Sequence, residues 1–433
     1  MGDFKYYLFA KPRDSVLIML GIGFGVIMPI VSAYLYPTYT NLMPEPWVET
    51  TRLLEFPFIA AELLVVLYTM RLGLSIERTW LSLSFDIKIA SVVLILGLFA
   101  SSIFISQRPL YSLSMSLANV VHIWFAFSVA YLIQVYGDNG RKQFLLWLGV
   151  GLIFLTFYIA WRFAFAPDPS QVRGGMIRWD NAIPGFISVR HFGSWTGAIA
   201  AAFSIRILYF EKDSKLNIHH FFYFLAAALT VWSGTRAAVL SMIFVLVVIV
   251  VTLRSFPRFR AIGIATFLTI LALVVASLLA PDHPAFLLYQ SSDSESVSSM
   301  MSSRDKFWAA TFYRWLDSPL WGWGSGSTFW EIYNGWTHTQ PHNAILQFLI
   351  TWGIVGTIGA LWLLARAIHA SHKSAGRFEY GIVLLAMLYS LLFQSLFEGM
   401  LHYPRFIIAI MMLFAIIIVG GRNPNTNGQK ASL

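Results

Sequence analysis

A pair of histidines could carry out acid–base chemistry at the start of an apolar segment. The sequence runs His338-Thr-Gln-Pro-His342-Asn343, and nine residues separate Asn343 from Gly353-Ile-Val-Gly356. Neutral imidazole can accept a proton near pH 7, so His342 could abstract a proton from a hydroxyl group. The alternative is structural, with His342 capping the helix that we predict to begin at Asn343. Position alone does not decide between these two roles.

Three arginines occupy positions that suit an anionic substrate. Arg190 stands immediately before a predicted helix, Arg236 ends a short Ser-Gly-Thr-Arg connection between two predicted helices, and Arg304 opens another. A guanidinium group binds phosphate oxygens through two parallel hydrogen bonds, and helix N-termini add oriented N–H groups. The three could therefore hold a pyrophosphate and stabilise it as a leaving group. The alternative is that they contact lipid headgroups or loop carboxylates.

Secondary candidates for the same site are His338, His191, Asn343 and Lys306. His338 and His191 could instead be loop histidines whose hydrogen bonds are satisfied within the protein. Asp293-Ser-Glu295 resembles the acidic motifs of metal-dependent sugar transferases, but it lies in a serine-rich run with no predicted helix or strand to hold it. We therefore predict no metal site.

Glu62 is an acidic residue inside the second predicted helix. A carboxylate within a membrane often marks a transport or proton path. No other carboxylate or lysine is predicted in the middle of a helix, so we favour a simple pairing with a polar neighbour such as Arg162 or Lys88.

The elements that must position these residues are membrane helices. The 433-residue chain is 57% hydrophobic and only 12% charged, whereas a soluble domain is about 25% charged. It has no cysteine, which excludes disulfides, thiolate catalysis and cysteine-ligated metals. Its net charge of +9 reflects membrane topology and suits anionic lipid or phosphate partners, and we do not expect nucleic acid binding.

We predict an all-α polytopic membrane protein with about 12 transmembrane helices, because each span needs about 20 mostly apolar residues. The predicted spans are 15–36, 57–71, 88–106, 112–136, 143–166, 192–210, 219–233, 237–253, 261–280, 343–368, 379–397 and 404–421. Alternate connections carry most of the lysines and arginines, so the positive-inside rule puts both termini in the cytoplasm and His342 on the far side.

One far-side connection, residues 281–342, is long enough to form a large loop inserted in an otherwise single membrane domain spanning 1–433. Within it, Arg304 to Leu316 is predicted to form a helix lying in the membrane interface. Its aromatic residues can share one face, and a glycine-rich Trp-Gly-Trp-Gly-Ser-Gly-Ser turn follows.

The combination of these motifs resembles the O-antigen ligase and polymerase superfamily. The resemblance is carried by Ser-Gly-Thr-Arg-Ala-Ala at 233–238, Arg304 with its aromatic helix, Ser-Pro-Leu-Trp-Gly-Trp-Gly from Ser318, and His342-Asn343 followed by Gly353 and Gly356. The spacing from His-Asn to Gly-x-x-Gly is similar to that of the ligases in particular.

The resemblance implies a membrane-embedded fold similar to the C-type glycosyltransferases, in the bacterial inner membrane. It implies transfer of a glycan from undecaprenyl pyrophosphate to a sugar of the lipid A-core on the periplasmic face, with inversion and without a metal or other cofactor. The family's donor-binding arginines correspond to Arg236 and Arg304, and Arg190 is a further candidate; its essential histidine corresponds to His342. The partners would be the undecaprenyl-pyrophosphate-linked O-antigen, the lipid A-core and membrane lipids.

Three alternatives remain at this point. An O-antigen polymerase would use the same donor but would transfer the glycan to a second lipid-linked repeat. A protein O-oligosaccharyltransferase usually carries extra periplasmic sequence after its last helix, which this sequence does not show. A lipid-linked glycan flippase or transporter would favour Glu62, together with repeated broken helices that carry charges at the midplane.

Overall fold

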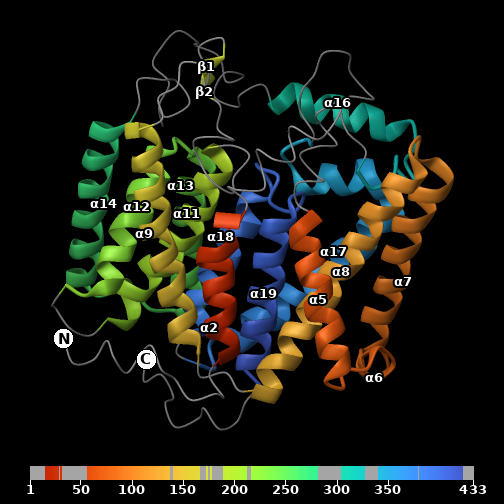
Figure 1. Ribbon diagram of the computed structural model, residues 1–433, viewed down its shortest axis with the longest axis horizontal. Coiled ribbons are helices and arrows are strands. Elements are labelled where there is room, and N and C mark those ends of the chain that lie inside the picture. The colour runs from red at the N-terminus through yellow and green to blue at the C-terminus, as the bar shows by residue number, and fades with distance from the viewer. Residues whose placement is uncertain are drawn as a thin grey trace.

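The structure is a computed structural model, and it is a bundle of α-helices (Figure 1). It describes residues 15–28, 30–31, 56–136, 140–165, 172–173, 176–177, 189–211, 216–280, 304–326, 340–378 and 380–422. The first half of the chain contributes α2 (Ser15–Ile22), η2 (Gly23–Ile27), α5 (Phe56–Arg71), α6 (Ile76–Ser82), α7 (Phe85–Ala100), η3 (Ser101–Ile105), α8 (Pro109–Tyr136), α9 (Arg141–Phe165), α11 (Val189–Ile205) and η5 (Arg206–Phe210). The second half contributes α12 (Ile218–Trp232), α13 (Arg236–Leu253), α14 (Phe259–Leu279), α16 (Arg304–Leu316), α17 (Ala344–Ala375), α18 (Gly381–Gln394) and α19 (Pro404–Gly420).

The described strands form one short antiparallel pair. β1 (Val172–Arg173) pairs with β2 (Met176–Ile177). This hairpin is too small to change the fold class, which is all-α as the sequence predicts.

Several helices are long and apolar enough to cross a membrane. Within the described residues there are 6 of them, or up to 7 if α5 and α6, which are bent by 89°, form one broken span. Each of the predicted spans overlaps a helix, but some of these helices, such as α18 and α19, are shorter apolar segments. The molecule is therefore a multi-pass membrane protein in character, and the prediction of about 12 crossings stays a prediction.

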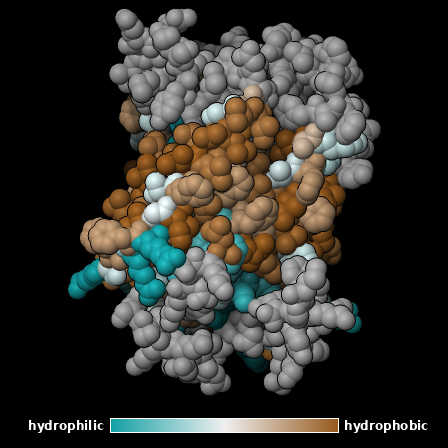
Figure 2. Space-filling view, turned by 90° about the vertical axis from the view of Figure 1, so that its left-hand side faces the viewer, coloured by the Kyte–Doolittle hydropathy of each residue, from teal (hydrophilic) through white to brown (hydrophobic). Residues whose placement is uncertain are grey.

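The core of the bundle lies around α11. All but two of its residues are buried, and it packs against α12, α13 and α18. On the other side, α17 packs along α7 and α19 packs along α8. The face over α9, α12 and α14 shows a broad apolar surface with hydrophilic residues gathered at one end (Figure 2), as expected for helices that face lipid.

The two ends of the bundle differ in chemistry. Arg236 begins α13, whereas Arg254 and Arg258 follow its other end. Similarly, α17 has His342 before its N-terminus and Lys373 in its last turn. α16 lies across the top of the bundle in Figure 1, and α6 lies at the opposite end. The candidate site residues thus share one end, away from most of the basic connections.

The glycine-rich turn after α16 is inserted into a break in α17. Gly353 has a φ of +60°, which interrupts the helix. On the N-terminal side of this break, two freed carbonyls of α17 accept hydrogen bonds from Trp323 N (2.7 Å) and Gly324 N (2.9 Å). On its C-terminal side, Ile354 N donates to Pro319 O (2.9 Å). This exchange satisfies backbone groups that would otherwise be orphaned, and it fixes α16 against the helix that begins beside His342.

The second glycine of the motif has a different role. A Cβ on Gly97 of α7 would collide with the backbone of Gly356, so α7 and α17 touch backbone to backbone at this point. Small residues allow such close approach of helices in membranes. The Gly-x-x-Gly spacing therefore sets both the break and the packing of α17.

Candidate active site

The N-cap of α17 is Asn343, not His342. The helix begins at Ala344, and the Asn343 side chain accepts hydrogen bonds from Ile345 N (3.0 Å) and Leu346 N (3.1 Å). The Asn343 amide also donates to Leu396 O (3.1 Å), which ties the start of α17 to the turn after α18. The structural alternative for His342 is therefore wrong, because a neighbouring residue satisfies the orphan donors.

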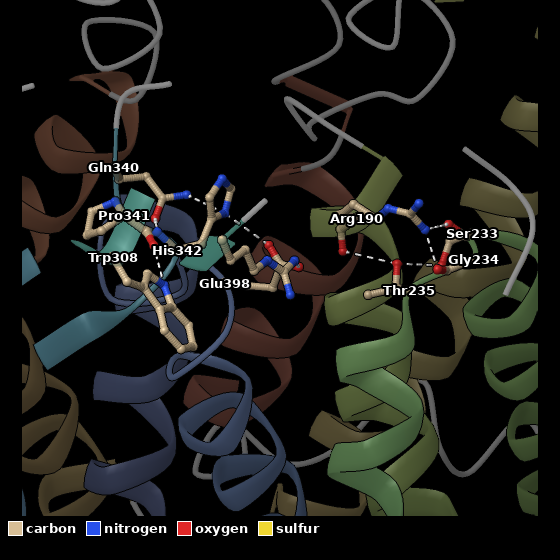
Figure 3. Close-up of polar contacts among 10 residues, drawn as sticks. Arg190, Ser233, Gly234, Thr235, Trp308, Gln340, Pro341, His342 and Glu398 are labelled. Carbon is tan, nitrogen blue, oxygen red and sulfur yellow. Dashed lines mark hydrogen bonds and ion pairs between the residues drawn. The ribbon is translucent and has the colours of Figure 1, made fainter. Parts of the chain in front are cut away.

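His342 adopts an unusual backbone conformation. Its φ is +53°, a left-handed value that is uncommon for a residue with a side chain. Its backbone N–H donates to Gln340 Oε1 (2.7 Å), and the carbonyl of Pro341 accepts from Trp308 Nε1 (2.9 Å) (Figure 3). These bonds hold the segment before α17 in a fixed shape, and strained backbone of this kind gathers at functional sites.

A carboxylate that the sequence analysis missed lies beside the imidazole. Glu398 Oε2 is 3.3 Å from His342 Nδ1, and the other oxygen, Oε1, forms an ion pair with Arg304. The side chain of Glu398 is 3% exposed, while that of His342 is 21% exposed. One carboxylate thus joins the candidate base to a candidate phosphate-binding group. The available signal was an acid in a predicted far-side connection, the same side as His342.

The environment keeps Glu398 ionised. Burial alone would raise the pKa of its carboxyl group, but the hydrogen bond with His342 and the positive charge of Arg304 outweigh burial and lower the pKa to about 2. Glu398 is therefore an anion at neutral pH.

Two groups compete for Nδ1 of His342. Gln340 Nε2 is 3.0 Å from it, and Glu398 Oε2 is 3.3 Å from it. Gln340 Nε2 is an amide nitrogen and can only donate to the imidazole, and Gln340 Oε1 already accepts from the backbone of His342. A bond to Gln340 places the ring proton on Nε2, whereas a bond to Glu398 places it on Nδ1 and makes Nε2 the basic nitrogen of the ring. The Glu398 contact is the one that suits a general base.

Arg190 is held by the turn between α12 and α13. Its guanidinium donates to Ser233 O (3.1 Å) and to Gly234 O, and its side chain points away from His342 and Glu398 in Figure 3. The turn lies very close to α11: a Cβ added to Gly193 would overlap Ser233 and Thr235. Arg190 lies inside the first turn of α11, whereas the sequence analysis placed it just before the helix.

The three predicted arginines belong to one electrostatic neighbourhood. Arg190 interacts electrostatically with Glu398, Arg236 and Arg304. Arg236 is the first residue of α13 and is partly buried, and Arg304 is the first residue of α16. Each cation therefore sits at or near a helix N-terminus, where N–H groups also favour an anion.

The secondary candidates have different surroundings. His191 is buried, packs on Tyr403 with ring centroids 4.5 Å apart, and interacts electrostatically with Glu398 and His342. Lys306 is exposed on α16 and takes no part in the contacts that join His342, Glu398 and Arg304. His338 lies outside the described residues. Arg405, which the sequence analysis did not single out, is buried at the start of α19 and interacts electrostatically with His191.

Glu62 has a partner other than those predicted. His122 Nδ1 is 2.6 Å from Glu62 Oε2, and both side chains are almost fully buried. The Lys88 amine instead donates to Leu81 O (3.0 Å), and the side chain of Arg162 lies outside the described part. The pairing joins α5 to α8, so the sequence analysis missed it by considering only arginine and lysine.

The described residues contain no group of three histidine, cysteine or carboxylate side chains placed to hold a metal ion. The Asp293-Ser-Glu295 segment lies outside those residues.

The family model described as O-antigen ligase matches residues 221–361. That match supports an O-antigen ligase-type family. The matched region runs from α12 to the middle of α17, so it contains Arg236, Arg304 and His342, while Arg190 and Glu398 lie outside it. The family is one of membrane glycosyltransferase-type enzymes that handle lipid-linked O-antigen and lipid A-core in general. No curated protein matches the chain.

Proposed function

We propose that this protein is an O-antigen ligase that transfers a glycan from undecaprenyl pyrophosphate to the lipid A-core at the periplasmic surface of the inner membrane. The observation that carries the proposal is the Arg304–Glu398–His342 chain of contacts. It links a cation suited to the pyrophosphate with an imidazole suited to activating a hydroxyl group. The family match to residues 221–361 supports the same reaction class.

In the proposed reaction, Arg190, Arg236 and Arg304 bind the donor pyrophosphate. His342 takes the proton of the acceptor hydroxyl through Nε2, and Glu398 stabilises the resulting imidazolium through Nδ1. The hydroxyl oxygen attacks the anomeric carbon from the side opposite the pyrophosphate, so the new glycosidic bond forms with inversion as the old carbon–oxygen bond breaks. The leaving pyrophosphate takes the electron pair, its charge is stabilised by the arginines, and the proton on His342 is then released to water.

The ion pair between Arg304 and Glu398 links the proposed pyrophosphate-binding residues to the proposed base. Glu398 contacts both Arg304 and His342. A bound pyrophosphate would compete with Glu398 for Arg304, because phosphate oxygens offer the guanidinium a bidentate partner. Glu398 would then be free to bind His342 Nδ1 in preference to Gln340. Donor binding would thus prepare the base.

The test is transfer by purified protein from undecaprenyl-pyrophosphate-linked glycan to lipid A-core in the presence of EDTA. We expect the wild-type protein to extend lipid A-core and His342→Ala to lose at least about 100-fold in rate, the scale of a general base. The matched control is His369→Ala, an exposed histidine in the last part of α17, which should keep normal activity. Elongation of the lipid-linked glycan without transfer to lipid A-core would show a polymerase instead. Normal transfer by His342→Ala would contradict the proposed mechanism.

A further inference from the structure

A pocket lies within the bundle, one to three helical turns along α17 from His342. Its empty volume, which includes space open to solvent, is about 540 Å³. It is lined by residues of α5, α8, α17 and α19, together with the glycine-rich turn and the segment before α19. None of the described lining residues is an aspartate, glutamate, lysine or arginine. The pocket therefore suits an uncharged ligand, unlike the arginine-rich site beside it.

Its wall offers hydrogen bonds that the described residues do not use. Gln347 lines the pocket one turn after Asn343, it is 6% exposed, and its Oε1 has no hydrogen-bond partner among the described residues. A buried acceptor without a partner costs free energy unless a ligand or water satisfies it. Gln347 is thus a point on the wall at which a donor group of a ligand is expected.

A histidine of α8 with a fixed orientation also faces this pocket. His122 lines the pocket, and its Nδ1 lies 2.6 Å from Glu62 Oε2 as an ion pair. The carboxylate fixes the orientation of the ring, so Nε2 is the nitrogen left for a hydroxyl group. Asn119 lines the same wall one turn earlier. Amide and imidazole groups that exchange hydrogen bonds with hydroxyls are a set that recognises a polyol.

An aromatic surface completes the pocket. Phe348 and Trp352 both line it, and their rings stack with centroids 4.8 Å apart and an interplanar angle of 16°. The indole N–H of Trp352 donates to Ser325 Oγ (2.8 Å), which fixes the ring. A rigid aromatic wall beside a few directed polar groups can take a ring that is apolar on its face and polar at its edge.

We propose that this pocket binds one uncharged sugar ring of the glycan substrates, with Gln347 and His122 as its hydrogen-bonding residues. The inference rests on the proposed function, because that function supplies a glycan at His342. The ring can belong to the donor glycan or to the acceptor core, and both present the same hydroxyl chemistry.

The first test uses the fact that the chain has no cysteine. A single Asn119→Cys substitution places one thiol on the pocket wall, and its rate of reaction with N-ethylmaleimide reports occupancy in the purified His342→Ala background. Three additions are compared: undecaprenyl-pyrophosphate-linked glycan, lipid A-core, and undecaprenyl pyrophosphate without sugar. We expect one of the first two to slow labelling about tenfold when present at about ten times its Kd, and the sugar-free lipid to have no effect.

The matched control is Phe259→Cys, at a residue that is 93% exposed at the start of α14 and far from the pocket in sequence and fold. Its labelling should not change with any addition. Equal protection of Asn119→Cys by the sugar-free lipid, or protection by none of the three, would overturn the proposal. This readout does not need turnover, so it stands apart from a failure of wild-type protein to transfer glycan, which would remove the proposed function instead.

The second test is kinetic. Gln347→Met keeps the side-chain length and removes the hydrogen-bonding groups. We expect the KM of the protecting substrate to rise about tenfold, the scale of one lost hydrogen bond, with little change in the KM of the other substrate or in kcat. A purely structural glutamine would lower kcat and both affinities together, or change none of them, and either result would contradict the sugar site.

Discussion

For the individual residues, the site depends on one buried carboxylate that contacts both an arginine and a histidine. Glu398 contacts His342 and Arg304 while it is almost fully buried. Removing one partner of a buried charged group leaves the other charge without compensation, which costs far more than the pair contributes. The identity of residue 398 should therefore affect both catalysis and stability.

We expect Glu398→Gln to lower the rate of glycan transfer by about 10- to 1000-fold, because a neutral amide no longer stabilises the imidazolium. The fold should persist, since glutamine has the same shape. The measurement is the transfer assay alongside a thermal melting curve. Glu77→Gln, at an exposed residue of α6, is the matched control. Wild-type transfer by Glu398→Gln would remove the carboxylate from the mechanism.

The same carboxylate predicts a pH dependence of stability. The folded protein holds the pKa of Glu398 at about 2, below its ordinary value of 4.5. The unfolded chain therefore binds the proton more readily, and the stabilisation is present above the ordinary pKa and is lost as the pH falls toward 2. The melting temperature of the wild-type protein should exceed that of Glu398→Gln at pH 6, and the difference should shrink between pH 4.5 and pH 3. A difference that grows on acidification would contradict the assignment.

At the scale of elements, the site depends on how α16 and its following turn are attached to α17. The broken helix and the glycine-rich turn exchange backbone hydrogen bonds at Gly353. The attachment brings Arg304 and His342, which are 38 positions apart, to the same carboxylate. The glycines of the motif are thus positioning residues that act through backbone geometry.

We expect Gly353→Ala to destabilise the protein by about 2 kcal/mol or more, because a residue with a side chain is strained at positive φ. In addition, its Cβ would overlap the carbonyl of Leu320. The melting temperature should fall and transfer should fall with it. Gly263→Ala in α14 is the matched control, since nothing lies within 4 Å of the added Cβ. Equal melting temperatures for the two variants would show that the break in α17 is not required.

At the scale of the whole molecule, the arrangement places the polar site at one end of an apolar bundle and most of the basic connections at the other. From this arrangement, the positive-inside rule predicts that the site lies on the periplasmic side. We expect a membrane-impermeant maleimide to label Asp317→Cys, next to α16, in intact cells of a cysteine-free background. Lys373→Cys, at the other end of α17, should react only after the membrane is permeabilised. The reverse pattern would place the site on the cytoplasmic side and would contradict the proposed function.

The helices and the main chemical groups could be predicted from the order of the amino acids. Long apolar runs predicted the spans, and all of them overlap helices, because a segment's hydropathy and its helix-ending residues are local properties. The same locality allowed the helix Arg304–Leu316 to be predicted with its observed bounds. Motif spacing drew attention to His342, Arg236 and Arg304, and the family match covers all three.

Which of these groups come into contact depends on how the helices pack together. Glu398 reaches His342 across 56 positions of sequence, and Glu62 reaches His122 across 60. Such contacts follow from the packing of α17 with α19 and of α5 with α8, and hydropathy patterns do not encode the partner or the rotation of a helix. The choice of Asn343 over His342 as the cap likewise depended on a one-residue boundary, which local patterns leave undefined.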